Sequence, residues 1–196
     1  MHSAVDAIAD EIRQVWDGAV EPVPDDLLPA TLLPATREFM TTVGLPTVPT
    51  LYTAFIIDGR LSTPVSLQGR EYVVFAEDEV VKPFAVELAS GQVFQLAPSP
   101  SRALGRRFLN SDIALFLYFY GILHRDVLRF IEAQGELTEA QFGSILDTLD
   151  NIEAGLRRWD PSAIDGKTAW WWLLYDLREE VDATLTEMGT RPVDGE

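Results

Sequence analysis

The chain has 196 residues, with 31 acidic and 15 basic side chains and a formal net charge of −16 at neutral pH. Hydrophobic residues make up 47% of it, which is enough for a full core and argues against a largely disordered chain. Because cysteine is absent, disulfides, thiolate nucleophiles and cysteine-based zinc sites are excluded, and a reducing cytoplasm fits.

The negative charge lies at the two ends of the chain. Residues 1–50 carry eight acids against two bases, residues 51–130 carry eight against eight, and residues 131–196 carry fifteen against five. A charge this negative argues against direct binding of nucleic acid, and it favours a basic protein partner or simply high solubility.

The N-terminal region predicts a helix followed by a proline-rich connector. Val5, Ile8, Ile12 and Val15 recur at helical spacing, and the stretch lacks the basic head and continuous apolar run of a signal peptide or membrane anchor. Prolines at 22, 24, 29 and 34 predict an extended connector, after which Thr36 is expected to cap a short helix.

The middle of the chain changes to a β-type pattern. Runs of β-branched and aromatic residues at 51–58, 70–77, 84–90 and 91–97 are separated by turn residues. Ser90-Gly91 is the clearest hairpin signal, because apolar residues alternate on both sides of it. We therefore expect an α+β fold: a twisted, mainly antiparallel sheet of four to six strands, flanked by N-terminal helices and covered by C-terminal helices.

A strongly apolar helix is expected from Asn110 or Ser111, either of which can cap it, with Asp112 in its first turn. Its core, residues 113–123, is too short to span a bilayer and is expected to lie against the sheet. Gly121 predicts either a close backbone approach or a break, with Asp126 capping the residues that follow.

Two helices are expected at the C-terminal end. Thr138 and Gln141 form a capping box for the first, whose apolar face runs from Phe142 to Trp159, and Asp160-Pro161 ends it. The second is expected over about 166–188, with an apolar stripe from Trp170 to Met188. At 100° per residue, Trp171 and Trp172 cannot both join that stripe, so at least one is expected to be partly exposed or covered by another surface.

Taken together these segments predict one α+β domain over residues 1–188. It comprises an N-terminal helix and proline-rich connector (1–35), the sheet with the long helix (36–134) and the C-terminal helical pair (138–188). A frayed tail is expected over 189–196.

Several of these segments resemble the SUKH superfamily, in particular the fourth type of SUKH immunity protein from bacterial polymorphic toxin systems. The resemblance rests on TREFMTTVGLP (36–46), FAVELASGQVFQL (84–96), RFLNSDIALFLYFY (107–120) and the tryptophans in DGKTAWWWLLYDL. It implies an α+β fold and a non-enzymatic role, which is to bind a cognate toxin domain, often a nuclease or deaminase, and so protect the producing cell.

The residues give no reaction centre. His2 and His124 are too isolated for a metal cluster or a Ser-His-Asp arrangement, and His124 is expected to be a helix-surface or satisfied packing residue. No catalytic residue, metal site or cofactor is therefore expected. Two other functions stay open: a regulatory or scaffold module, like the fungal cell-wall regulators of the same superfamily, and an enzyme that uses carboxylates as acid and base.

The expected partner is a cognate protein toxin, basic in character, in the cytoplasm, with no contact to nucleic acid or membrane. Turns and sheet edges present recognition surface, so the acidic side chains near the sheet are the expected contact set, namely Asp58, Glu77, Asp78 and Glu79. Trp172 is the expected aromatic anchor.

Overall fold

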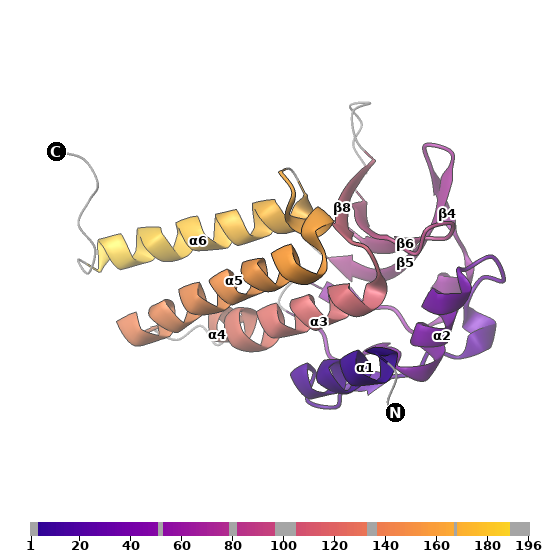
Figure 1. Ribbon diagram of the computed structural model, residues 1–196, viewed down its shortest axis with the longest axis horizontal. Coiled ribbons are helices and arrows are strands. Elements are labelled where there is room, and N and C mark those ends of the chain that lie inside the picture. Colours follow the sequence, from indigo (N-terminus) through magenta and orange to yellow (C-terminus); the bar gives the residue numbers. More distant parts are fainter. Residues whose placement is uncertain are drawn as a thin grey trace.

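The computed structural model describes residues 4–50, 53–78, 82–96, 105–132, 137–166 and 168–188. The frayed tail expected over 189–196 lies outside these residues. Helical and strand segments follow the expected α+β order, and the helices extend well beyond one side of the sheet (Figure 1).

The N-terminal part contains α1 (Ala4–Val15), β1 (Val20–Glu21), a 3₁₀ turn η1 (Asp25–Leu27), α2 (Pro34–Thr42) and β2 (Leu45–Pro46), with β1 and β2 paired antiparallel. The helix α2 begins at Pro34, two residues before the expected cap Thr36, which is buried instead. Proline suits the first helical position because the amide that it lacks would have no partner inside the helix there.

The main sheet has six strands, and all of its neighbouring pairs are antiparallel. The order is β3-β5-β6-β7-β8, and β4 also pairs with β5. The strand count and direction agree with the expectation. The strands are β3 (Thr53–Phe55), β4 (Val65–Leu67), β5 (Arg70–Asp78), β6 (Phe84–Glu87), β7 (Val93–Leu96) and β8 (Arg106–Asn110), with a 3₁₀ turn η2 (Gly59–Ser62) before β4.

The strand β8 was not predicted, because Arg106 and Arg107 made the segment resemble a polar approach to the helix. In the structure Arg106 and Arg107 are consecutive residues of β8, so their side chains point to opposite faces of the sheet. The Arg106 guanidinium donates to the Tyr72 hydroxyl at 2.8 Å and to the Glu87 carboxylate at 3.1 Å. Both arginines are only partly exposed, since their aliphatic stems follow the sheet surface.

The helix over the sheet consists of α3 (Ile113–Leu123), a π-helical segment η3 (His124–Leu128) and α4 (Arg129–Glu132), joined end to end. Its cap is Asp112, whose carboxylate accepts from the Leu115 amide at 2.8 Å, and not Asn110 or Ser111 as predicted. Gly121 causes no break. A Cβ there would lie 2.7 Å from both Trp16 Nε1 and Val15 Cγ2, so its role is the close approach of α1 to α3.

The C-terminal part contains α5 (Glu139–Trp159), a 3₁₀ turn η4 (Pro161–Ile164) and α6 (Ala169–Glu187). The predicted capping box is present, with Thr138 N donating to Gln141 Oε1 at 2.9 Å and Gln141 N donating to Thr138 Oγ1 at 3.3 Å. Trp159 and Met188, expected on the buried faces, are 45% and 47% exposed because each stands at the end of its helix.

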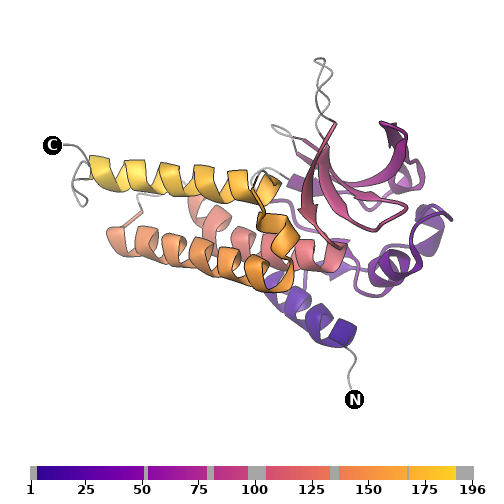
Figure 2. The ribbon, with the colours of Figure 1, turned by 45° about the horizontal axis from the view of Figure 1, so that its top comes forward.

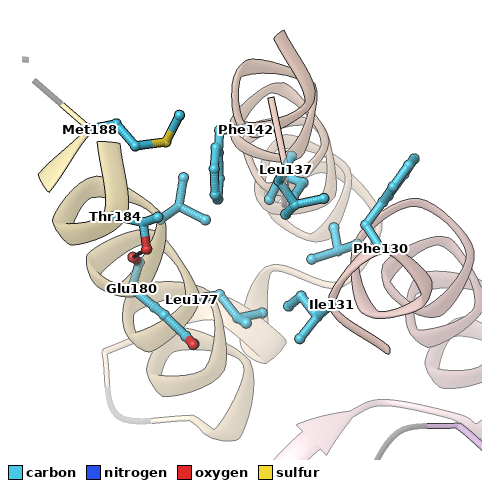
Figure 3. Close-up of a pocket in the computed structure, with 11 residues that line it drawn as sticks. Phe130, Ile131, Leu137, Phe142, Leu177, Glu180, Thr184 and Met188 are labelled. Atoms are coloured by element: carbon cyan, nitrogen blue, oxygen red, sulfur yellow. Dashed lines mark hydrogen bonds between the residues drawn. The ribbon is translucent and has the colours of Figure 1, made fainter. Parts of the chain in front are cut away.

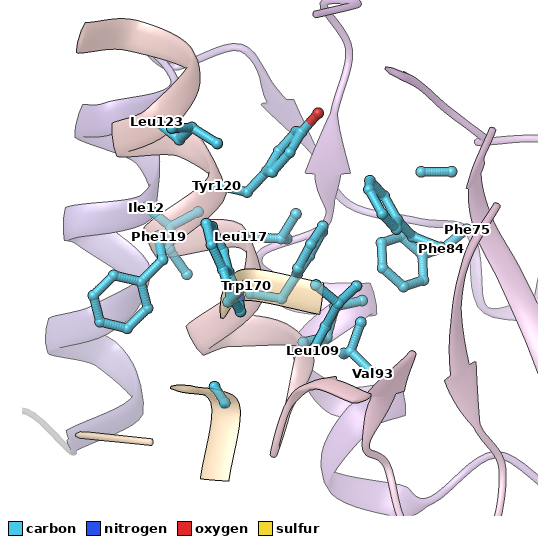
Figure 4. Close-up of a cluster of buried hydrophobic side chains, with 14 of the residues drawn as sticks. Ile12, Phe75, Phe84, Val93, Leu109, Leu117, Phe119, Tyr120, Leu123 and Trp170 are labelled. Carbon is cyan, nitrogen blue, oxygen red and sulfur yellow. The ribbon is translucent and has the colours of Figure 1, made fainter. Parts of the chain in front are cut away.

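One face of the sheet packs on α3, where Phe75 and Phe84 meet Phe116 edge to face and Leu109 and Val93 complete the contact (Figure 4). Helix α1 covers the far side of α3, whereas α5 runs alongside α3 and α6 alongside α5, both extending away from the sheet (Figure 2). The opposite sheet face carries a smaller cluster of Tyr72, Ala85, Phe94 and Leu96. The C-terminal helical pair therefore forms an arm that meets the sheet at β8.

Candidate functional site

The arm is attached to the sheet by a buried polar network. Trp170 Nε1 donates to Asn110 Oδ1 at 2.8 Å, and Asn110 Nδ2 donates to Asp160 Oδ2 at 3.1 Å. Asp160 also accepts from the Ser111 amide and hydroxyl, both at 2.7 Å. These bonds tie the start of α6 and the end of α5 to the last residues of β8. They fix the direction in which α6 leaves the sheet.

The outward face of α6 begins with aromatic side chains. Trp172 is 38% exposed and Tyr175 is 45% exposed, while Trp170 beside them is buried. The Trp171 ring stacks on Tyr175 with 5.4 Å between centroids and meets Trp172 edge to face at 4.8 Å. The expectation that one of the paired tryptophans would be partly exposed is therefore confirmed. Rigid, half-exposed aromatics of this kind are typical of protein-binding surfaces.

Carboxylates continue this face toward the end of the helix. Asp176 and Glu179 follow Trp172 at helical spacing and are exposed, and within the described part of the chain neither has an ion-pair partner. Helices α5 and α6 together carry nine acidic and three basic residues. Two of those three bases are already engaged, since Arg157 pairs with Glu153 and Arg178 pairs with Asp150 and Glu153. The arm therefore presents a negative surface with an aromatic end.

The predicted acidic set beside the sheet has a different electrostatic setting. Arg60 pairs with Asp58 at 2.9 Å and with Glu77 at 2.6 Å. The hydrogen bond from the Arg60 side chain is the main cause that lowers the pKa of Asp58. Asp78 is the last residue of β5, and Glu79 lies outside the described residues. The structure thus brings Asp58 and Glu77 together around one guanidinium, with an open cavity of about 750 Å³ beside them.

The two predicted groups lie near opposite edges of the sheet. Glu77 is on β5, next to the edge strand β3, whereas Trp172 lies beside β8, where the Arg107 guanidinium is 6.0 Å from its ring. Three strand spacings, about 14 Å, separate β5 from β8. Trp172 and the acidic set therefore do not form one compact patch.

A groove opens farther along the arm, between α4, α5 and α6 (Figure 3). It has a volume of about 500 Å³, and its lining is mostly apolar, with Phe130, Ile131, Leu137, Phe142 and Leu177 around it. Sequence reasoning missed this groove, because each of these residues resembles an ordinary core position. Only their arrangement on three helices leaves one side open.

A smaller cavity of about 240 Å³ lies between the end of α1 and η3, next to His124. His124 is buried, its ring stacks on Trp16 at 5.3 Å, and burial is the main cause that lowers its pKa. Its Nδ1 has no hydrogen-bond partner within the described part of the chain, and neither does Oε1 of Glu132. The sequence predicted that His124 is a helix-surface residue or a satisfied packing residue. Both predictions are wrong, because the residue is buried and its Nδ1 has no partner among the described residues.

Two further observations concern metal binding and membrane insertion. No group of three or more His, Asp or Glu side chains within the described ranges is placed to hold a metal ion. None of the helices that the structure describes is long and apolar enough to cross a bilayer.

In the comparison with protein families, the SUKH-4 immunity protein model matches residues 7–176 of the chain. No curated protein and no solved structure matches the chain. The matched region includes most of α1, the whole sheet, α3, α5 and the start of α6 with its tryptophans. It therefore confirms the resemblance found in the sequence and supports a toxin-immunity role. The chain belongs to the SUKH-4 immunity protein family.

Proposed function

We propose that the protein is a cytoplasmic, non-enzymatic immunity protein that binds a cognate toxin domain of the nuclease or deaminase class and occludes its substrate path. The observation that carries the proposal is the outward face of α6, where Trp172 and Tyr175 lie next to carboxylates that have no basic partner in the described chain. Family membership supports the immunity role itself.

The charge of the arm suits such a partner. A toxin that acts on nucleic acid must attract phosphate and so presents a basic face. A negatively charged binder gains association rate by electrostatic steering and competes with nucleic acid for that face. Asp176 and Glu179 supply this attraction without first losing an ion pair to any residue that the structure describes.

Affinity requires a desolvated anchor as well as charge. Trp172 already exposes 38% of its surface and is held against Trp171, so little rotamer freedom is lost when a partner covers it. Tryptophan and tyrosine are enriched among the residues that dominate binding energy. We assign Trp172 the anchoring role.

The acidic set near the sheet is a second proposed contact. The set consists of Asp58, Glu77, Asp78 and Glu79, of which Asp58 directly precedes the η2 turn and Glu77 and Asp78 are the last two residues of β5. For Asp58 and Glu77 a toxin arginine has to compete with Arg60 or share its carboxylates. This contact is therefore expected to contribute less than the α6 face.

The first step is to look for a toxin reading frame beside this chain's gene, and the test is binding to the toxin domain that it encodes. Association rates are measured for the wild type and for Trp172→Ala, Asp176→Asn and Glu179→Gln at low and high salt. The two acidic variants are expected to associate more slowly at low salt only, whereas Trp172→Ala is expected to dissociate faster at both. Wild-type protein that fails to bind this toxin would contradict the proposed function.

A further inference from the structure

The groove on the arm has the geometry of a helix bundle that lacks one helix. The segments η3 and α4 form one wall, α6 forms the other, and α5 lies between them (Figure 3). Apolar side chains from all three line the space, including Val127, Phe142 and Val181. Three helices arranged in this way leave an apolar stripe that a fourth helix can cover.

The mouth of the groove exposes apolar side chains at a cost in free energy. Phe130 on α4 is 37% exposed, and Met188 at the end of α6 is 47% exposed. They border the groove from opposite sides, so one occupant can cover both. Methionine adapts its shape readily, which suits it to a surface that receives a partner side chain.

Among the described residues that line the groove, Glu180 is acidic and none is basic. Glu139 in the first turn of α5 and Glu187 in the last turn of α6 each lie within two residues of a lining residue. None of these three carboxylates has an ion-pair partner in the part of the chain that the structure describes. The chemistry that matches the groove is therefore an apolar stripe with cationic groups beside it.

The dimensions favour a helical occupant. Leu177 and Met188, both of which line the groove, are eleven residues apart on α6, which corresponds to about 16 Å or three helical turns. A helix with apolar residues at i, i+3, i+4 and i+7 presents side chains along that length. Lysine or arginine on its flank would then meet Glu180.

We propose that this groove receives an amphipathic, lysine- or arginine-flanked helix of the toxin domain, and that Glu180 pairs with one of its cationic side chains. The inference rests on the proposed function and specifies which kind of toxin segment docks, namely a helix with an apolar face and cationic flanks. A second copy of this chain is a poorer occupant, because docking would bring two acidic chains together at a net charge of −16 per chain.

The test uses the full chain and the toxin domain encoded beside its gene. Two groove variants, Glu180→Arg and the double variant Phe130→Ala with Met188→Ala, are compared with two controls away from the arm and from the acidic set, Glu38→Arg on α2 and Val48→Ala after β2. All of these side chains are partly or fully exposed, so the fold is expected to persist. We expect each groove variant to raise the Kd roughly tenfold or more and the controls to leave it unchanged.

Hydrogen exchange on the wild-type complex identifies the occupant independently of the variants. The expected result is protection of residues 177–188 in this chain together with one helical, basic-flanked segment of the toxin. If both groove variants bind with unchanged affinity, the groove is not the docking site, although the proposed immunity function remains. If the wild-type chain does not bind the toxin, the proposed function itself is wrong. Protection of a non-helical toxin segment, or a self-associated dimer that Glu180→Arg disperses, also overturns the inference.

Discussion

The indole nitrogen of Trp170 donates a 2.8 Å hydrogen bond to the side-chain oxygen of Asn110, 60 residues earlier in the chain. Both residues are fully buried, and the Asn110 side-chain nitrogen in turn donates a hydrogen bond to the Asp160 carboxylate. This bond joins α6 to β8, so the direction of the arm depends on it.

The first prediction concerns this bond. Trp170→Phe keeps a large apolar ring but leaves the Asn110 oxygen without its donor, so the free energy of unfolding is expected to fall by about 1–3 kcal/mol. Urea denaturation measures the change. The matched control is Trp172→Phe at the exposed position, where a change of no more than about 0.5 kcal/mol is expected. Equal effects of the two substitutions would contradict the structural role of the Trp170 bond.

The second prediction concerns two helical glycines with opposite surroundings. At Gly121 a Cβ would lie 2.7 Å from atoms of Val15 and Trp16 at the end of α1, whereas at Gly143 on α5 no atom beyond the adjacent residues and the backbone of its own helix lies within 4 Å of it. Gly121→Ala is therefore expected to lower stability by about 1–3 kcal/mol through overpacking. Gly143→Ala is expected to raise it by up to about 1 kcal/mol, because alanine is the better helix former. Thermal melts test whether Gly121→Ala lowers the melting temperature and Gly143→Ala raises it.

The third prediction concerns Glu87, which is 2% exposed and accepts from Arg70 at 2.7 Å and Arg106 at 3.1 Å. Burial alone would raise its pKa, but hydrogen bonds from Arg70 and Ser90 and the charges of both arginines outweigh burial and lower it below the ordinary 4.5. The ionised carboxylate therefore stabilises the fold above pH 4.5. This contribution is lost as the pH falls through the lower pKa of the folded state.

Glu87→Gln tests this contribution. The variant is expected to be less stable than wild type at pH 7, by about 2 kcal/mol, and the difference should narrow as the pH falls below about 4. The exposed Glu71 on the neighbouring strand β5 is the control, and Glu71→Gln should follow the wild-type curve. Urea midpoints between pH 3 and pH 7 measure the effect. A gap between Glu87→Gln and wild type that stays constant over this range would contradict ionisation of Glu87 as its source.

The fourth prediction concerns the acidic set at the sheet. The double variant Asp58→Asn with Glu77→Gln removes both partners of Arg60 and leaves an extra positive charge there. If this region contacts a basic toxin, association should slow several-fold at low salt and recover at high salt. Stopped-flow kinetics provide the measurement, with Glu38→Gln on α2 as the control. A rate equal to that of the control removes these residues from the interface.

The parts of the fold that sequence reasoning predicted are those with local causes. The Thr138–Gln141 capping box and the turn at Ser90-Gly91 each involve residues that are close in the chain, so their spacing was sufficient. The position of the helix cap was wrong because Ser111 bonds Asp160, 49 residues away, and that partner cannot be read from spacing. Arg106 concealed β8 for the same reason, since its partner Glu87 lies on a different strand.

The candidate site was predicted only in part. Helical geometry was sufficient to expect one exposed tryptophan, and Trp172 is exposed. The sequence showed the acidity of Asp58 and Glu77 but not that Arg60, between them in the chain, neutralises much of it. The groove could not be predicted, because it depends on how α4, α5 and α6 pack and not on any residue type at one position.

The central claim is that the protein acts by covering a toxin domain. Titration of the purified chain into the active toxin domain encoded beside its gene tests it most directly. We predict that toxin activity falls to zero at one equivalent of this chain, and that Trp172→Ala shifts the titration to higher concentration. Full toxin activity at a large excess of the wild-type chain would contradict the claim.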